Sequence, residues 1–128
     1  MIYFFRQKLP RTIVSTLAAA LLMSCNGNRQ AKGIVTQFLD NNLKDTDYSA
    51  EYFSKVDSTF VISDSVLNDM RTKANQTGLF KSLKFGERGN SRKLNYIRVR
   101  YILGNDTIKQ TFYLDASTTC VVALKQDV

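Results

Sequence analysis

The hydrophobic pattern of the chain changes its period near Gly78. Upstream of this glycine, apolar residues recur three and four positions apart, which is typical of helices that bury one face. We predict a helix over residues 31–43, a short helix over residues 49–56, and a third helix that Asp64 or Ser65 caps and that ends near residue 76. Residues 58–62 are rich in β-branched and aromatic side chains and predict a short strand.

Downstream of Gly78, apolar and polar residues alternate, as they do in strands with one buried face. The alternation begins in residues 79–85 and is clearest in residues 94–103, 108–114 and 118–125, which polar turns separate. These segments predict an antiparallel meander. Helices followed by a meander indicate an α+β domain, in which N-terminal helices pack on a curled sheet of three to four strands.

The register of the central hairpin can also be predicted. A turn at residues 105–106 sets Val99 opposite Phe112 and gathers the apolar side chains on one face. Moving the turn back by one residue sets Arg100 opposite Lys109. Because like charges directly opposite each other destabilise a sheet, we predict the first register.

The side chains opposite the predicted core combine basic and aromatic residues. This composition is expected at binding hot spots and equally on an exposed sheet face that keeps a protein soluble. Both interpretations stay open at this point. The predicted binding face consists of Tyr96, Arg98, Arg100, Lys109, Thr111 and Tyr113.

Residues 1–24 have the pattern of a targeting segment. Arg6, Lys8 and Arg11 form a positive region, and an apolar run of eleven residues follows from Thr12 to Leu22. That run is too short to span a bilayer, which needs about 20 apolar residues. A simple secretory signal would end in a small-x-small site, whereas this one ends in Leu-Met-Ser-Cys.

These residues resemble a bacterial lipoprotein signal, whose pattern is an aliphatic residue, a small or aliphatic residue, a small residue and then cysteine. Leu22, Ser24 and Cys25 match this pattern, whereas Met23 is less usual in it. The resemblance implies a diacylglyceryl thioether on Cys25, cleavage before Cys25 and acylation of the new amine. Several acyl chains give stable anchoring to a membrane. Residues 26–30 lack the acidic run that in some Gram-negative groups is associated with export to the cell surface, so we expect the periplasmic face of a Gram-negative cell membrane, outer or inner. The alternative is an uncleaved signal or a plain anchor helix.

Processing at this site would leave a single domain. Residues 1–24 would be removed, residues 25–30 would form the lipidated cysteine and a polar tether, and residues 31–128 would form one α+β domain, as the length allows. The formal net charge of +7 would fall to +4 with the loss of the three basic residues in the signal. Cys120 would be the remaining free thiol.

The domain itself resembles two kinds of known protein. Its order of elements resembles the cystatin-like and nuclear-transport-factor-2-like α+β rolls, some of which enclose a cavity. Several short segments resemble the opening of a group of small bacterial lipoproteins of unknown function, which also end in an aromatic strand like residues 112–115. Those opening segments are Phe38-Leu39, residues 42–45, Tyr48, Phe53-Ser54, residues 56–58 and Phe60.

Composition excludes several chemistries. The chain has no histidine, which excludes Ser-His-Asp and Cys-His catalysis and every histidine metal site. Two cysteines cannot form an all-cysteine zinc site. A calcium loop beginning at Asp45 fails because Ala50 takes the place of the required glycine and Val56 that of the glutamate. We predict no catalytic residue, no metal ion and no cofactor.

An enzyme would need acids or bases in a pocket. Tyr101 and Gln110 fall on the predicted core face, and Asp40 or Asp57 could line the same concavity. The simpler interpretation is that Tyr101 buries its ring and hydrogen-bonds its hydroxyl at the edge of the core. Fold analogy does not establish chemistry, so we expect a protein that is not an enzyme.

Charge is uneven along the chain. Residues 40–69 hold seven acids and two bases, and residues 81–100 hold seven bases and one acid. The acidic helices offset the basic strands, or the basic surface serves an anionic partner such as lipid head groups, glycan phosphates or an acidic envelope protein. Nucleic acid would suit the charge, but the compartment argues against it. We expect a non-enzymatic binding or accessory module of the cell envelope; the alternative is a roll whose cavity binds or processes a small molecule.

Overall fold

The computed structural model describes residues 26–128. This part contains two helices and a five-stranded antiparallel sheet, which confirms the α+β class. The predicted signal and Cys25 lie outside the described residues. The elements are α2 (Asn26–Asn42), β1 (Tyr48–Phe53), β2 (Asp57–Thr59), α3 (Asp64–Gln76), β3 (Leu94–Leu103), β4 (Asp106–Leu114) and β5 (Val121–Gln126).

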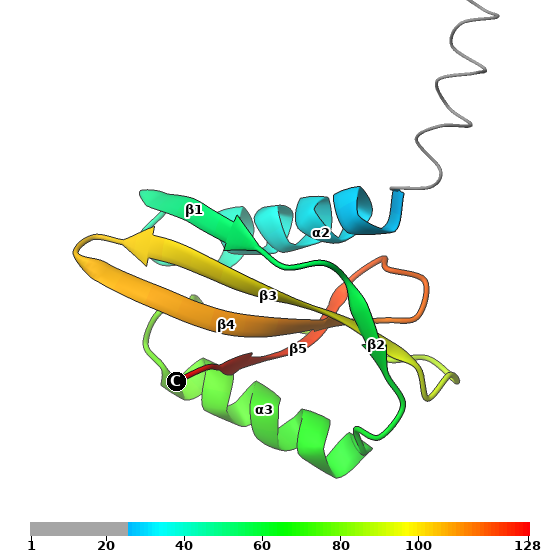
Figure 1. Ribbon diagram of the computed structural model, residues 1–128. Coiled ribbons are helices and arrows are strands. Elements are labelled where there is room, and N and C mark those ends of the chain that lie inside the picture. Colours follow the sequence, from blue (N-terminus) through cyan, green and yellow to red (C-terminus); the bar gives the residue numbers. More distant parts are fainter. Residues whose placement is uncertain (1–25) are drawn as a thin grey trace, which may run out of the picture.

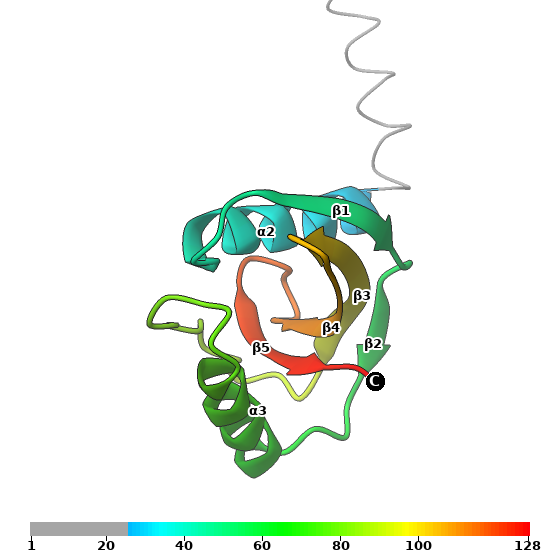
Figure 2. The ribbon, with the colours of Figure 1, turned by 90° about the vertical axis from the view of Figure 1, so that its left-hand side faces the viewer.

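The sheet lies between the two helices. Its strand order is β1-β3-β4-β5, and β2 pairs with β3 beyond the end of β1. The strands curl into a roll that α2 closes on the concave side, and α3 packs on the outside (Figures 1 and 2). Neither helix within residues 26–128 has the length and apolar content to cross a bilayer.

The main core fills the concave side. Ala31, Val35 and Leu39 of α2 are completely buried in one cluster with Ile97 and Phe112 of the sheet. These α2 positions are spaced by four residues, so a single stripe of the helix meets the sheet. The spacing confirms the predicted amphipathic helix.

Aromatic rings complete this core. The ring of Phe38 contacts the rings of Phe80, Phe85 and Phe112, with centroid separations of 6.0, 5.9 and 5.8 Å. Phe80 and Phe85 come from residues 79–85, which were predicted as part of the meander. This segment forms no strand; Phe80 makes an isolated bridge to Leu43. Its alternating apolar residues enter the core from a loop, so the alternation does not require ladder pairing.

A second core lies on the outer face. Leu67 and Met70 of α3 pack with Leu94, Tyr113 and Ala123 of the sheet. The cap is Ser63, so the predicted cap at Asp64 or Ser65 is wrong by one or two residues. Ser63 has extended backbone angles, and its Oγ accepts a hydrogen bond of 3.2 Å from the amide of Val66. The outer face is therefore covered at one end, whereas we had expected it to be open.

Residues 48–53 form strand β1, so the predicted helix over residues 49–56 is wrong. Nucleating a helix of two turns is unfavourable, and the aromatic residues of this segment favour a strand. The edge of β3 supplies partners for it, with Tyr48 opposite Leu103 and Phe53 opposite Val99. Tertiary pairing decides the conformation here.

The predicted hairpin register is also wrong. Gly104 and Asn105 form the turn, Leu103 pairs with Asp106, and Arg100 pairs with Lys109. Gly104 has a φ of +63°, in the left-handed region that glycine adopts without strain. A two-residue turn with glycine first matches the twist of the strands, and this preference outweighs the charge repulsion.

Residues 26–30 form the first turns of α2, where a tether was predicted. Gln30 donates a hydrogen bond of 3.0 Å to the carbonyl of Thr118, which holds the start of the helix against the β4–β5 loop. Because of that loop, the last strand begins at Val121 and not at residue 118 as predicted. Asp115 organises it by accepting hydrogen bonds from the amides of Thr119 and Cys120 at 2.6 and 3.1 Å. Burial alone would raise the pKa of Asp115, but these hydrogen bonds lower it.

Cys120 packs at the edge of the second core beside Gly86. A Cβ added to Gly86 would lie 2.8 Å from the Cβ of Cys120 and closer still to its sulfur, so this position requires glycine. The Gly86 amide donates a hydrogen bond of 3.0 Å to the carbonyl of Val121. Burial and the charge of Asp115 raise the pKa of the Cys120 thiol.

Candidate functional site

The structure places all six residues of the predicted binding face on the outer face of the sheet. They stand in three consecutive rows, because β3 and β4 pair Tyr96 with Tyr113, Arg98 with Thr111 and Arg100 with Lys109. The predicted and observed registers differ by two positions, so each side chain keeps its face. The six residues were therefore correctly predicted to share one face, although the register was wrong.

Half of this face is not free. Tyr113 lies in the second core beneath α3, and Tyr96 packs against the same cluster. Thr111 is buried and its Oγ1 donates a hydrogen bond of 2.8 Å to the Asp127 carboxylate. These three residues serve packing and support. Arg98, Arg100 and Lys109 remain exposed at the end of the sheet that α3 leaves uncovered.

The three exposed cations line a groove of about 400 Å³. Its other walls are Tyr52 from β1, Val99 from β3 and Asp127 after β5. Sequence reasoning missed Tyr52, because its segment was assigned to a helix, and Asp127, because the residue lies beyond the predicted last strand. Simple alternation would not have found Tyr52, because a bulge after Ala50 moves it to the outer face, opposite Arg100.

The groove holds cations that repel each other. Arg100 and Lys109 are directly opposite across β3 and β4. The Arg100 guanidinium lies 5.5 Å from the centroid of the Tyr52 ring, and its Nε lies 3.7 Å from the Glu51 carboxylate. Among residues 26–128, neither Arg98 nor Lys109 forms an ion pair. The groove therefore has excess positive charge.

A second groove of about 920 Å³ lies between the β2–α3 loop, the start of α3 and residues 87–92. Arg88 crosses it, forming an ion pair of 3.2 Å with Asp64 and donating to the carbonyl of Ile62. The side chain of Arg88 is 13% exposed, and its Nε has no hydrogen-bond partner within the described part of the chain. Arg88 holds the loop of residues 87–92 against the helix.

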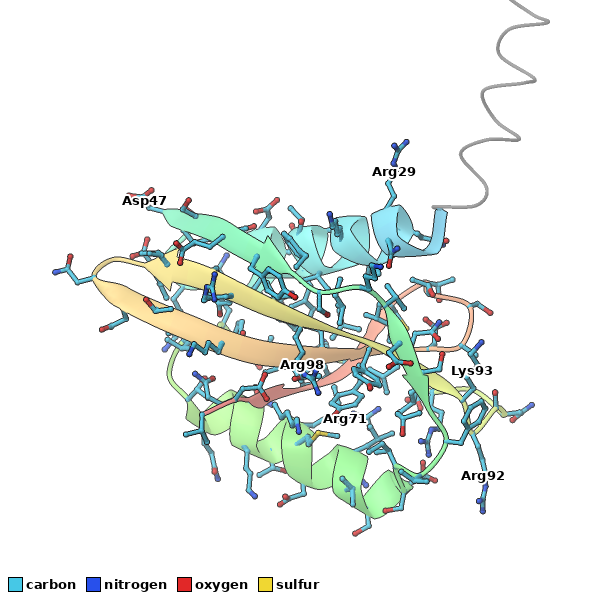
Figure 3. The ribbon with its side chains drawn as sticks, viewed as in Figure 1. Arg29, Asp47, Arg71, Arg92, Lys93 and Arg98 are labelled. Atoms are coloured by element: carbon cyan, nitrogen blue, oxygen red, sulfur yellow. The ribbon has the colours of Figure 1, made fainter. Side chains whose placement is uncertain are left out.

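Arg71 has a similar structural role in the same groove. It donates hydrogen bonds of 2.8 Å to the carbonyl of Val122 and 3.3 Å to that of Gly86. Figure 3 shows Arg71 between α3 and the sheet, whereas Arg98 extends from β3 on the outer face. The guanidinium of Arg71 thus uses its hydrogen bonds to join backbone segments of the protein itself.

The polar groups of the concave side are paired with one another. The Tyr101 hydroxyl donates a hydrogen bond of 2.8 Å to Gln110, and Gln110 donates one of 3.0 Å to Gln126. Burial raises the pKa of Tyr101. Tyr48 donates a hydrogen bond of 2.7 Å to Asp40, and burial together with this carboxylate raises the pKa of Tyr48 to about 12. Tyr101 thus has the buried, hydrogen-bonded position that was the simpler interpretation.

Two further findings concern the chemistry of the site. In the part of the chain that the structure describes, no three acidic or cysteine side chains gather in a group that could hold a metal ion. Comparison of the chain with protein-family models, with curated proteins and with solved structures gave no match. A functional assignment therefore depends on the geometry of the groove and on the sequence.

Proposed function

We propose that this protein is a lipid-anchored lipoprotein of the Gram-negative cell envelope, and that it binds an anionic group in the groove of Arg98, Arg100 and Lys109. The Leu-Met-Ser-Cys ending of the N-terminal segment supports acylation of Cys25. The observation that carries the binding role is the cross-strand pair of Arg100 and Lys109. Two like charges held opposite each other cost stability, and an anion between them would relieve that cost.

The groove suits a phosphate or carboxylate. An arginine guanidinium presents a planar fork of donors that matches these anions with two parallel hydrogen bonds. Lysine adds a compact positive charge beside it. Tyr52 supplies a rigid aromatic wall that already contacts Arg100. These features favour a non-enzymatic binding or accessory role, with a phosphorylated glycolipid or an acidic protein as sources of the anion.

The shape of the domain supports its resemblance to the cystatin-like and nuclear-transport-factor-2-like rolls. A long helix closes the concave side of a curled antiparallel sheet (Figure 2). Aromatic and aliphatic side chains fill the space between them, and the polar groups there are satisfied by one another. Binding on the outer face is therefore better supported than binding beneath the sheet.

Isothermal titration calorimetry with inorganic pyrophosphate at low salt measures the affinity of the groove for an anion and so tests the binding role. Each charge-assisted hydrogen bond contributes roughly 1.5–3 kcal/mol, so Arg100→Gln and Lys109→Gln should each weaken binding by about tenfold or more. Lys73→Gln is the matched control, because Lys73 is an exposed lysine on α3 whose partner is Asp69. Equal weakening by the control, or unchanged binding after Arg98→Glu with Arg100→Glu, would show that the groove is not the site.

A further inference from the structure

The start of α2 and three loops gather at one end of the domain, which we call the anchor end. The loops are residues 60–63, 87–93 and 115–119, and all lie on the right in Figure 1. Hydrogen bonds connect these segments. Gln30 reaches Thr118 from the start of α2, and Arg88 reaches Ile62 and Asp64 from the loop of residues 87–93.

The anchor end is next to Cys25 in the sequence. Asn26, the first described residue, already belongs to α2 and directly follows Cys25, so one peptide bond joins the helix to the acylated cysteine of the proposed function. One residue spans at most about 3.6 Å. Acyl chains on Cys25 would therefore hold the first turn of α2 at the bilayer surface and turn the anchor end towards the lipid.

The anchor end exposes two adjacent apolar side chains. Phe60 is 58% exposed and Val61 is 87% exposed, and both border the 920 Å³ groove. Exposed neighbours of this kind are costly in water but can enter the boundary between lipid head groups and acyl chains. They lie at the turn between β2 and α3, where Ser63 caps the helix.

Basic residues occupy the same end of the molecule as these apolar side chains. Figure 3 shows Arg29, Arg92 and Lys93 at this end of the molecule, and Arg92 also lines the groove. Asp64 is neutralised by its ion pair with Arg88, whereas Asp115 accepts hydrogen bonds from neutral groups and keeps its negative charge. Glu87 is exposed, and Glu87 and Asp115 together reduce the three positive charges of Arg29, Arg92 and Lys93 to a net charge of +1. The remaining excess of positive charge would be attracted to anionic lipid.

We propose that the anchor end is a membrane-docking surface: Phe60 and Val61 enter the head-group region of an anionic bilayer, and Arg92 and Lys93 contact lipid phosphates. This inference rests on acylation of Cys25. Docking would fix the orientation of the domain. The C-terminus lies on the side of the domain away from the anchor end (Figure 1), and Asp127, the residue before the exposed Val128, lines the groove of Arg100 and Lys109.

Single-tryptophan variants test this orientation, because the chain contains no tryptophan. The lipidated protein is placed in vesicles of phosphatidylethanolamine and brominated phosphatidylglycerol. Val61→Trp should give blue-shifted emission that the brominated chains quench. Val128→Trp, at the exposed C-terminus, is the matched control and should keep the emission of an indole in water. If the tryptophans of both variants emit as in water, or if both are quenched equally, the docking surface is overturned.

Mass spectrometry of the same samples separates two failures. Absence of acyl chains on Cys25 overturns the anchor and, with it, this inference. An acylated protein whose Val61→Trp side chain stays in water overturns the docking surface and leaves the anchor standing.

The charge contribution is tested in the Val61→Trp variant. A basic residue near an anionic surface changes the ratio of docked to undocked protein about fivefold, so Arg92→Gln with Lys93→Gln should lower it about 25-fold. Lys81→Gln with Lys84→Gln removes the same charge from an exposed loop away from the anchor end and should leave the quenching unchanged. Equal loss from both pairs would mean that net charge, not this surface, governs docking.

Discussion

Arg100 and Lys109 illustrate a conflict between stability and binding at the scale of single residues. The hairpin turn at Gly104 sets them opposite each other, although an alternative register would have separated them. Arg100 is partly compensated by Glu51 and by the ring of Tyr52. Among residues 26–128, Lys109 has no comparable partner. An anion in the groove would supply one.

We therefore expect Lys109→Gln to stabilise the unliganded protein. Removing one of two like charges in a directly opposed pair should raise the free energy of unfolding by about 0.5 kcal/mol. Urea denaturation at low salt measures this change. Lys125→Gln is the control, since Lys125 is opposite Thr111 and faces no cation across the strands. A gain of the same size in both variants would attribute the effect to overall charge.

At the scale of elements, α3 decides which part of the outer face is available. It covers Tyr113 and leaves Arg98, Arg100 and Lys109 exposed. Its start is fixed by the Oγ of Ser63, which accepts from the amide of Val66. Its buried face consists of Leu67, Met70 and Ala74.

Ser63→Ala should destabilise the protein by about 1 kcal/mol, because it leaves a helix-terminal amide without its acceptor. Thermal or urea unfolding measures the loss. Ser65→Ala is a matched control in the first turn of the same helix, and Ser65 is exposed there. A loss from Ser65→Ala as large as that from Ser63→Ala would contradict a capping role.

The sequence predicted some elements well because local signals determine them. Strand β3 has the predicted bounds and α3 has the predicted end, whereas α3 is capped by Ser63 and not by residue 64 or 65. Strand β1 was missed because its conformation depends on pairing with β3, which is distant in the chain. The register was missed because the preference of a glycine turn outweighed a charge rule. No pattern within residues 64–76 indicates which face of the sheet that helix will cover.

The candidate site was predictable to the same extent. Alternation alone places the six residues on one face, since side chains along a strand point in turn to either side. Thr111 is buried where it hydrogen-bonds to Asp127, and Tyr113 is buried beneath α3. The positions of Asp127 and α3 depend on the complete fold. Tyr52 reaches the groove for a similar reason, because its place next to Arg100 requires the β1–β3 pairing.

At the scale of the whole molecule, helices on opposite faces of the sheet leave two separate surfaces. The anchor end lies where α2 begins, and the groove of Arg100 and Lys109 lies towards the C-terminus (Figure 1). A protein held through Cys25 would present these surfaces in different directions. The anchor is the premise on which that arrangement depends.

Fractionation of Gram-negative cells tests the anchor. Cys25→Ser removes the atom that would carry the diacylglyceryl group, so signal processing at this site should fail and no acylated mature protein should be found in the membrane fraction. Cys120→Ser is the matched control and should be processed and retained like the unchanged protein, because Cys120 lies at the edge of the second core. Mature Cys25→Ser protein in the membrane fraction would contradict the lipid anchor.

The close approach of Gly86 to Cys120 has a consequence for redox chemistry. A lone thiol in an oxidising compartment is exposed to mixed-disulfide formation, in which a thiolate attacks a disulfide sulfur in line. Here the raised pKa keeps the sulfur protonated, and the backbone of Gly86 lies against it. The same glycine that lets the backbone pass close to Cys120 at the edge of the second core thus makes exchange at this thiol slow, so the domain can keep an unpaired cysteine without being cross-linked through it.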